Sequence, residues 1–233
     1  MTTKNNIDPQ EIEQFNQLAN DWWSPLGPMK ALHDINPIRL NYIESKINLA
    51  GKTVLDMGCG GGILSEGLAQ RGAIVTGCDM AKEALTVAKN HAEQSQLNIT
   101  YLEQTAEELA QNNQEKFDIV TCMEMLEHIP DPYSVVKACL SLVKPGGHII
   151  FSTINKTPKA FLFAIVMGEY VLKLIPKQTH HYEKFITPAK LSRWIQNSNS
   201  KIEDISGLSY QPITKSYYLS RDIGVNYFVH ATN

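Results

Sequence analysis

The sequence predicts an α/β fold: a Rossmann-like, seven-stranded, mostly parallel sheet with helices on both faces. Between residues 53 and 155, five short apolar segments of strand character alternate with helix-like stretches rich in alanine, leucine and charged residues. A glycine-rich segment, 58–62, follows the first apolar segment, and Asp79 ends the second. With 233 residues, 43% of them hydrophobic, the chain can form a single domain, 1–233, around its own core.

Residues 1–50 predict a helical N-terminal cover. Asp8 is placed to cap a helix that starts at Pro9, and apolar residues then repeat at helical spacing. A second helix is expected over Pro37–Ile47. Trp22–Trp23, between the two helices, either cover a ligand site or fill the core.

The five strand segments are followed by an insertion and an antiparallel edge. In chain order they are TVLDM, AIVTGCD, ITYLE, FDIVTCM and HIIFST. FDIVTCM is almost continuously apolar, which is typical of a parallel strand buried on both faces. After Ser152 the alternation stops, and residues 157–197 predict a helical insertion or lid after the fifth strand. Lys201–Ile205 and Val225–Ala231 are then expected to complete the sheet.

Composition and charge exclude several classes of protein. Lys plus Arg number 21 and Asp plus Glu 24, a net charge of −3, which lacks the basic field that nucleic-acid binding needs. The four cysteines form no C-x-x-C pair, so neither a zinc cluster nor a disulfide framework is indicated. The N-terminus has no signal-peptide pattern and no stretch reaches the roughly 18 apolar residues of a membrane span. We therefore expect a cytoplasmic protein.

The glycine-rich segment VLDMGCGGG, residues 54–62, lies between the first strand and a helix that begins near Ile63. Glycines let a ligand approach the backbone, and the unpaired N–H groups of a helix start favour a phosphate or a carboxylate. A dinucleotide fingerprint read from Gly58 requires Gly or Ala where this chain has Ile63. Asp56 disfavours a pyrophosphate but suits a ligand that carries an ammonium group beside its carboxylate.

Asp79 lies about twenty residues after the glycines, where an acidic side chain accepts hydrogen bonds from a ribose diol. A ligand that joins an amino acid to a nucleoside satisfies both Asp79 and Asp56. Two alternatives are a tight structural turn and a nicotinamide dinucleotide. The dinucleotide shares Asp79 but has no use for Asp56.

Through VLDMGCGGG, Asp79 and FDIVTCM, residues 50–155 resemble class I S-adenosylmethionine-dependent methyltransferases. Further segments make the whole chain similar to the ubiquinone-biosynthesis O-methyltransferase family. These segments are FNQLANDWWSPLGPMKALHDINPIRLNYI, TCMEMLEHIPDP, THHYEKFITPAKL and GLSYQPIT. The resemblance implies an enzyme that methylates phenolic hydroxyls of polyprenylated catechol and quinol intermediates, with S-adenosylmethionine as methyl donor.

The resemblance and the glycine segment together identify candidate cofactor contacts. The expected cofactor-binding residues are Arg39, Asp56, Gly58, Gly60, Asp79 and Met123. The family pattern implies that Arg39 pairs with the methionine carboxylate and that Met123 packs against apolar parts of the cofactor. Otherwise Arg39 forms a surface ion pair and Met123 is a core residue. Thr105–Glu107, after the third strand, is expected to flank the adenine.

Candidate catalytic residues follow the fourth strand. A phenol has a pKa of about 10, so methyl transfer to it needs a general base or a metal ion that acidifies it. Glu124, Glu127 and His128 would share one face of a helix. They are expected to act in catalysis, either as Mg²⁺ ligands, as the resemblance implies, or through His128 as a base. Alternatively they cap amides and pack a helix end, and His180 is a second candidate base.

The most apolar part of the chain indicates how the substrate is reached. Ala160–Ile175 is too short to span a bilayer, and Lys156–Lys184 holds five lysines and two glutamates, a local excess of three positive charges. This pattern favours an anionic membrane surface as a partner and a peripherally membrane-associated location. There the protein would meet a lipophilic polyprenyl phenol or quinol and other ubiquinone-biosynthesis proteins. The alternative is a helix buried over the active site.

Two other functions are compatible with these residues. A methyltransferase of another small-molecule acceptor would keep the whole cofactor site, because the acceptor pocket lies in the least diagnostic third of the chain. A non-catalytic, membrane-associated module that binds S-adenosylmethionine would keep the glycine segment without needing Glu124, Glu127 or His128.

Overall fold

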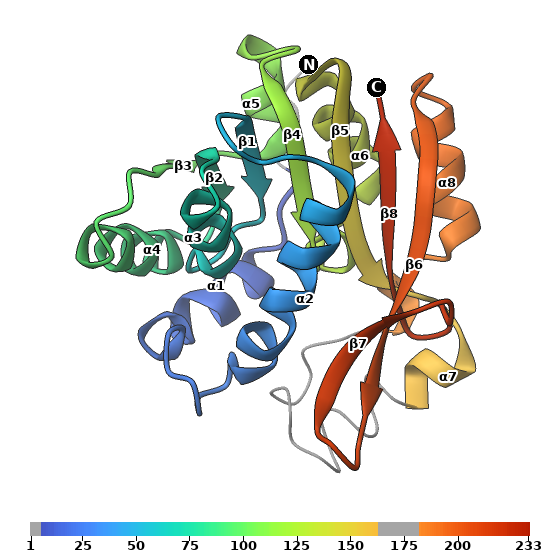
Figure 1. The fold of residues 1–233 in the computed structure, drawn as a ribbon, viewed down its shortest axis with the longest axis horizontal. Coiled ribbons are helices and arrows are strands. Elements are labelled where there is room, and N and C mark those ends of the chain that lie inside the picture. The colour runs from blue at the N-terminus through green and yellow to red at the C-terminus, as the bar shows by residue number, and fades with distance from the viewer. Residues whose placement is uncertain (1–5, 163–181) are drawn as a thin grey trace.

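The centre of the molecule is a mixed sheet (Figure 1). The computed structural model describes residues 6–162 and 182–233, and eight strands of this part form the sheet. The strands are β1 (Thr53–Met57), β2 (Ile74–Asp79), β3 (Thr100–Glu103), β4 (Phe117–Met123), β5 (Val143–Ile154), β6 (Lys201–Gln211), β7 (Ser216–Ser220) and β8 (Asn226–Thr232). Their order is β3-β2-β1-β4-β5-β8-β6-β7. Strands β1 to β5 are parallel, whereas β8, β6 and β7 run antiparallel to their neighbours.

The predicted α/β class and the five parallel strands are confirmed, but the predicted number of seven strands is wrong. The sixth strand extends past the predicted Lys201–Ile205 to Gln211, and its continuation pairs with β7 as a hairpin. Serines and Gly207 interrupt the apolar pattern of this hairpin, so its local strand signal is weak.

Apolar side chains pack on both faces of the sheet. Val120 and Cys122 of β4 belong to the core on the side of α5, α6 and α8, whereas Ile119 and Met123 belong to the core on the side of α2 and α3. This explains why FDIVTCM is almost continuously apolar. The helices are α1 (Pro9–Gln17), α2 (Lys30–Lys46), α3 (Ile63–Gln70), α4 (Lys82–Gln94), α5 (Ala106–Asn112), α6 (Pro132–Leu142), α7 (Pro158–Ala160) and α8 (Pro188–Gln196), with 3-10 helices η1 (Ala19–Asp21), η2 (Leu126–His128) and η4 (Tyr182–Lys184).

The N-terminal helices follow the predicted pattern with one correction. The side chain of Asp8 caps α1 and Pro9 is its first residue, as predicted. However, α2 starts before Pro37, which lies inside the helix and supplies no backbone N–H. Beside the proline, Asn36 Nδ2 donates a 3.0 Å hydrogen bond to the backbone oxygen of Ile63. Tertiary contacts therefore outweigh the local preference of proline.

The predicted helical insertion, 157–197, is described at its two ends. These ends contain α7, η4 and α8. The predictions for residues 163–175 as a docking helix and for His180 as a base lie outside the described residues. None of the helices in the described parts is long and apolar enough to cross a membrane.

Candidate cofactor and acceptor site

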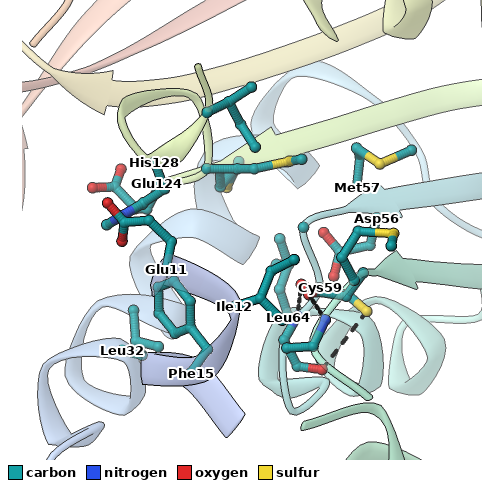
Figure 2. Close-up of a pocket in the computed structure, with 18 of the residues that line it drawn as sticks. Glu11, Ile12, Phe15, Leu32, Asp56, Met57, Cys59, Leu64, Glu124 and His128 are labelled. Carbon is teal, nitrogen blue, oxygen red and sulfur yellow. Dashed lines mark hydrogen bonds and ion pairs between the residues drawn. The ribbon is translucent and has the colours of Figure 1, made fainter. Parts of the chain in front are cut away.

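A cavity of about 290 Å³ opens at the carboxyl ends of β1, β2 and β4. Open sheets with parallel strands bind ligands at this edge. Side chains of α1 and α2, including Ile12, Phe15 and Leu32, cover the cavity opposite the glycine segment (Figure 2). Leu208 and Tyr217 of the β6–β7 hairpin also line it. Segments from both ends of the chain therefore complete a pocket whose floor belongs to the central sheet.

The glycine segment has a backbone that other residues adopt only with strain. Gly58 has a φ of +74° and Gly60 a φ of +51°. A Cβ on Gly60 would lie 2.2 Å from the ring of Trp22, and Trp23 Nε1 donates a 2.9 Å hydrogen bond to the backbone oxygen of Gly61. Glycine is thus required both for the turn and for the close approach of the N-terminal cover.

Hydrogen-bond donors fix the two aspartates of the site. Asp79 Oδ2 accepts a 2.8 Å hydrogen bond from the backbone N–H of Gly60. Asp56, which is 2% exposed, accepts from Ser65 Oγ at 2.7 Å and from Thr121 Oγ1 at 2.9 Å. Burial raises the pKa of both carboxyls, although these hydrogen bonds oppose the rise. Asp79 therefore ties the end of β2 to the glycine segment at the cavity wall.

The turn after β3 lines another part of the cavity through Gln104–Glu107. Thr105 caps α5: its Oγ1 accepts from the backbone N–H of Glu108 at 3.2 Å, and the Glu108 carboxylate accepts from the Thr105 N–H at 3.0 Å. This capping box fixes the turn and leaves Ala106 as an apolar element of the wall.

A buried arginine lies beside the end of β4. Arg39 is 5% exposed, and its Nη2 lies 4.0 Å from Oε1 of Glu124. Its Nε and Nη2 are buried and have no hydrogen-bond partner within the described residues. Burial lowers the pKa of Arg39, although the charges of Glu124 and Asp56 oppose this. A buried guanidinium with unused donors is the arrangement that an anionic ligand group would satisfy.

Glu124 occupies a strained turn. Its φ of +56° lies in the left-handed region, which is uncommon for residues other than glycine. Ser152 Oγ of β5 donates to its carboxylate at 2.5 Å and Asn226 Nδ2 of β8 at 2.8 Å. The 3-10 helix η2 follows this turn in place of the predicted α-helix.

Glu127 and His128 point to different neighbours. Glu127 Oε2 accepts a 2.8 Å hydrogen bond from Thr153 Oγ1 of β5. His128 Nδ1 lies 3.0 Å from Oε2 of Glu11 on α1. The prediction that Glu124, Glu127 and His128 share one helical face is therefore wrong, because the segment is not α-helical.

Glu11 connects His128 to the segment that precedes α8. It is 9% exposed, and its Oε1 lies 2.8 Å from Nζ of Lys184. The ring of Phe15, on the same helix, meets the His128 imidazole edge-on at 5.3 Å. Burial raises the pKa of Glu11, but hydrogen bonds and charges of His128 and Lys184 outweigh this and bring it to about 2. Glu11 is therefore a carboxylate at neutral pH.

This geometry does not support the predicted magnesium site. Across residues 6–162 and 182–233, no three His, Cys, Asp or Glu side chains are placed to hold a metal ion. Glu124 is bonded to β5 and β8, Glu127 to β5, and His128 to α1. The two glutamates are thus held by β5 and the histidine by α1, and these contacts do not indicate the common set of ligands that Mg²⁺ requires.

The chain is similar to methyltransferases over nearly its whole length. Residues 55–151 match the family described as methyltransferase domain. The ubiquinone biosynthesis O-methyltransferase of Pseudomonas fluorescens (strain Pf0-1) is 54% identical over 224 residues, which cover 96% of this chain and 97% of that protein. The protein of the same name from Saccharophagus degradans is 53% identical over 233 residues, 99% of each chain. The chain belongs to the ubiquinone biosynthesis O-methyltransferase family.

This S-adenosylmethionine-dependent methyltransferase also has counterparts among solved structures. Magnesium protoporphyrin IX methyltransferase (ChlM) from Synechocystis PCC 6803, solved with bound SAH, has a TM-score of 0.66 at 20% identity and covers 88% of this chain and 85% of its own. An S-adenosylmethionine-dependent methyltransferase from Thermotoga maritima has a TM-score of 0.69 at 13% identity, with 95% and 99% covered. These likenesses confirm the class I methyltransferase fold.

In this methyltransferase the cavity brings most of the predicted site residues together. The predicted cofactor residues that line it are Arg39, Asp56, Gly58, Gly60, Asp79 and Met123. Glu124 and His128 line it as well. Glu127 does not belong to the described residues that form the lining.

Sequence reasoning missed the partners of these residues. Glu11 holds His128, and Asn226 holds Glu124, over separations of more than a hundred residues. One signal existed for the first: Glu11 lies one helical turn from Phe15, so an acidic residue interrupts the apolar stripe of α1. Leu208 lies in the segment GLSYQPIT that resembles the family, but no pattern there indicates a cavity wall, and Tyr217 carries no such signal.

Proposed function

We propose that this methyltransferase transfers the methyl group of S-adenosylmethionine to a phenolic hydroxyl of a polyprenylated catechol or quinol in ubiquinone biosynthesis. The observation that carries the proposal is the identity of 53–54% to ubiquinone biosynthesis O-methyltransferases along nearly the whole chain. The cavity supports it, because apolar side chains such as Leu32, Met123 and Leu208 border its polar end.

Arg39 and Asp56 are proposed to bind the amino-acid end of the cofactor. Arg39 pairs with the carboxylate, for which its buried Nε and Nη2 are available as donors. Asp56 receives the amino group, since each of its oxygens accepts one hydrogen bond from the described residues and retains a second lone pair. Each charged group at this end of the cofactor is thus paired with a protein side chain of opposite charge.

The nucleoside end is assigned to the next strand. Asp79, at the end of β2, is proposed to accept hydrogen bonds from the ribose hydroxyls. Gly58 and Gly60 let the cofactor approach the backbone, and Met123 packs against its apolar parts. The turn at Gln104–Glu107 flanks the adenine.

Methyl transfer requires that the acceptor hydroxyl lie in line with the donor and lose its proton. When bound, S-adenosylmethionine supplies an electrophilic methyl group. We assign the proton to His128, whose ring orientation is fixed by the contact of Nδ1 with Glu11. Glu124 orients the hydroxyl with the carboxylate that Asn226 holds. Glu127 stabilises the turn through the hydrogen bond that it accepts from Thr153 of β5.

We also propose that an anionic membrane surface presents the lipophilic substrate. Phe161 and Leu162, after α7, are 45% and 48% exposed although both are large and apolar. They belong to the start of the apolar run 160–175. The wider segment Lys156–Lys184, which contains this run, carries an excess of three positive charges. Wild-type protein should sediment with cardiolipin vesicles at low salt and Phe161→Asp should not. Equal sedimentation of both proteins would contradict this part of the proposal.

The reaction is tested with labelled S-adenosylmethionine and catechols with and without a polyprenyl chain, the products being identified by mass spectrometry. Wild-type protein should yield the O-methylated catechol, and His128→Asn should lose about 10²-fold or more in kcat while retaining affinity for S-adenosylhomocysteine. Parallel reactions in EDTA and in Mg²⁺ decide the metal question. Activity that EDTA abolishes and Mg²⁺ restores would overturn the assignment of proton removal to His128 alone. Methylation of other small molecules but of no catechol would favour the alternative acceptor.

A further inference from the structure

The β6–β7 hairpin has one apolar and one polar face. In its register Leu208 pairs with Leu219 and Tyr210 with Tyr217, and paired residues of antiparallel strands share a face. The rings of Tyr210 and Tyr217 lie 4.9 Å apart. The opposite face is mostly polar, and its members are Gly207, Ser209, Gln211, Ser216, Tyr218 and Ser220. Figure 1 shows this hairpin projecting away from the rest of the sheet.

Two residues of the apolar face, Leu208 and Tyr217, belong to the cavity, whereas Leu219 on the same face is 40% exposed. Leu208 and Tyr217 line it together with Leu32, Ile35 and Arg39, which form one stripe along α2. Leu208 is 7% exposed and packs in the same core cluster as Ile35. Burial, followed by the proximity of Tyr210, raises the pKa of Tyr217 to about 12, so this side chain presents a neutral ring. Leu208 and Tyr217 of the hairpin and Leu32 and Ile35 of α2 thus form two apolar walls of the same cavity.

The apolar face lies between the residues that hold Glu124 and the turn of the hairpin. Leu208 pairs across the sheet with Asn226, whose Nδ2 donates to Glu124 at 2.8 Å. Toward the turn of the hairpin the apolar face continues from Leu208 to the cross-strand pair of Tyr210, which is partly exposed, and Tyr217. Ile213 in that turn is 89% exposed. A molecule between the walls would have its inner end at Glu124 and its outer end at an apolar exit.

We propose that the apolar face of the β6–β7 hairpin determines acceptor specificity: Leu208 and Tyr217 hold the aromatic ring of the acceptor against α2, and the face guides its apolar chain outward. The inference rests on the proposed function, since it assumes a phenolic acceptor with an apolar substituent. An aromatic ring gains from stacking on Tyr217, and an isoprenoid chain gains from every apolar surface that it covers. Neither contact involves the cofactor.

The test compares two acceptors, a catechol without a chain and the same catechol carrying a farnesyl chain. Tyr217→Ala and Leu208→Ala should lower kcat/KM for the farnesylated catechol by about tenfold or more, mainly through KM, and should lower it less for the short catechol. Affinity for S-adenosylhomocysteine should change by less than about twofold. Tyr217→Phe keeps the ring and should remain close to wild type.

Tyr218→Ala is the matched control, because Tyr218 is the neighbour of Tyr217 on β7 but lies on the opposite face and is 47% exposed. Thermal unfolding checks each variant, and if Leu208→Ala is unstable, the pair Tyr217→Ala and Tyr217→Phe decides. The proposal is overturned if Tyr217→Ala affects the farnesylated catechol no more than Tyr218→Ala does, or if binding of S-adenosylhomocysteine falls in parallel. Wild-type protein that methylates neither catechol would instead refute the proposed function.

Discussion

Replacing Arg39 by methionine should weaken binding of the cofactor at its carboxylate end. Nε and Nη2 of Arg39 make no hydrogen bond within the described residues, so the substitution breaks none at these atoms. Glu124, 4.0 Å away, keeps its hydrogen bonds from Ser152 and Asn226. Methionine fills similar space without a buried charge. However, the substitution leaves the carboxylates of Glu124 and Asp56 without the charge that compensates them, so the Tm of the ligand-free protein should fall, and affinities are compared at a temperature at which the variant is folded.

The loss of affinity follows from the bonds that Arg39 would make to a carboxylate. Two charge-assisted hydrogen bonds contribute about 1.5–3 kcal/mol each, so Arg39→Met should cost about 3 kcal/mol or more, at least about a hundredfold in Kd. Titration calorimetry with S-adenosylhomocysteine measures this. 5′-Methylthioadenosine keeps the nucleoside but lacks the carboxylate, and its affinity should not change.

Arg71→Met is the matched protein control, because Arg71 forms a surface ion pair with Glu44 at 2.8 Å outside the cavity. It should leave both ligands bound with wild-type affinity. Equal losses of affinity for S-adenosylhomocysteine and 5′-methylthioadenosine in Arg39→Met would refute the assignment of Arg39 to the carboxylate. A Tm equal to that of Arg71→Met would show that the guanidinium does not compensate the carboxylates of Glu124 and Asp56.

Two further predictions concern stability. Gly60→Ala should lower Tm and cofactor affinity more than Gly51→Ala. Both glycines have a positive φ, but an added Cβ meets the Trp22 ring at position 60 and no atom within 4 Å at position 51. Similar effects of both substitutions on thermal unfolding would contradict this prediction. The second prediction concerns His148 and His230, whose Nδ1 and Nε2 atoms lie 3.1 Å apart. Burial lowers the pKa of both imidazoles. The charge of Lys52 lowers the pKa of His148 further, and the charge of His148 lowers that of His230 further. Since the unfolded chain then binds protons first, stability should be full above about pH 6.5 and fall as the pH drops toward the folded-state pKa values. In urea titrations at pH 7 and 5 the double variant His148→Gln plus His230→Gln should lose less stability than wild type, and equal losses would rule out this pair as the cause.

The cofactor half of the site could be predicted because its signals are local. The strand–glycine–helix segment at 54–62 and Asp79 lie at the ends of adjacent parallel strands, and parallel pairing brings those ends to one edge. Spacing along the chain then fixes spacing in the fold. The same reasoning located the turn at Thr105–Glu107, which β3 delivers to that edge.

The residues after β4 could not be placed by the same rule. Whether Glu124, Glu127 and His128 share a face depends on the backbone at Glu124, and its left-handed conformation is accompanied by hydrogen bonds from Ser152 and Asn226. Local propensity favours a helix start there, whereas long-range hydrogen bonds hold Glu124 in the left-handed turn. A sequence pattern indicates local propensity but does not predict long-range hydrogen bonds.

The division between local and long-range signals has a functional counterpart. The groups assigned to the cofactor lie largely on β1, β2 and β4 and the turns after them, whereas the walls assigned to the acceptor come from α2 and the β6–β7 hairpin, outside the parallel core. Substitutions in the hairpin can therefore change the acceptor while the glycine segment, Asp79 and Arg39 keep their geometry. One fold can serve methyltransferases with different acceptors when the acceptor walls lie outside the cofactor site. On these assignments acceptor identity is best sought in the hairpin and in Leu32 and Ile35 of α2, whereas the glycine segment and Arg39 report the methyl donor.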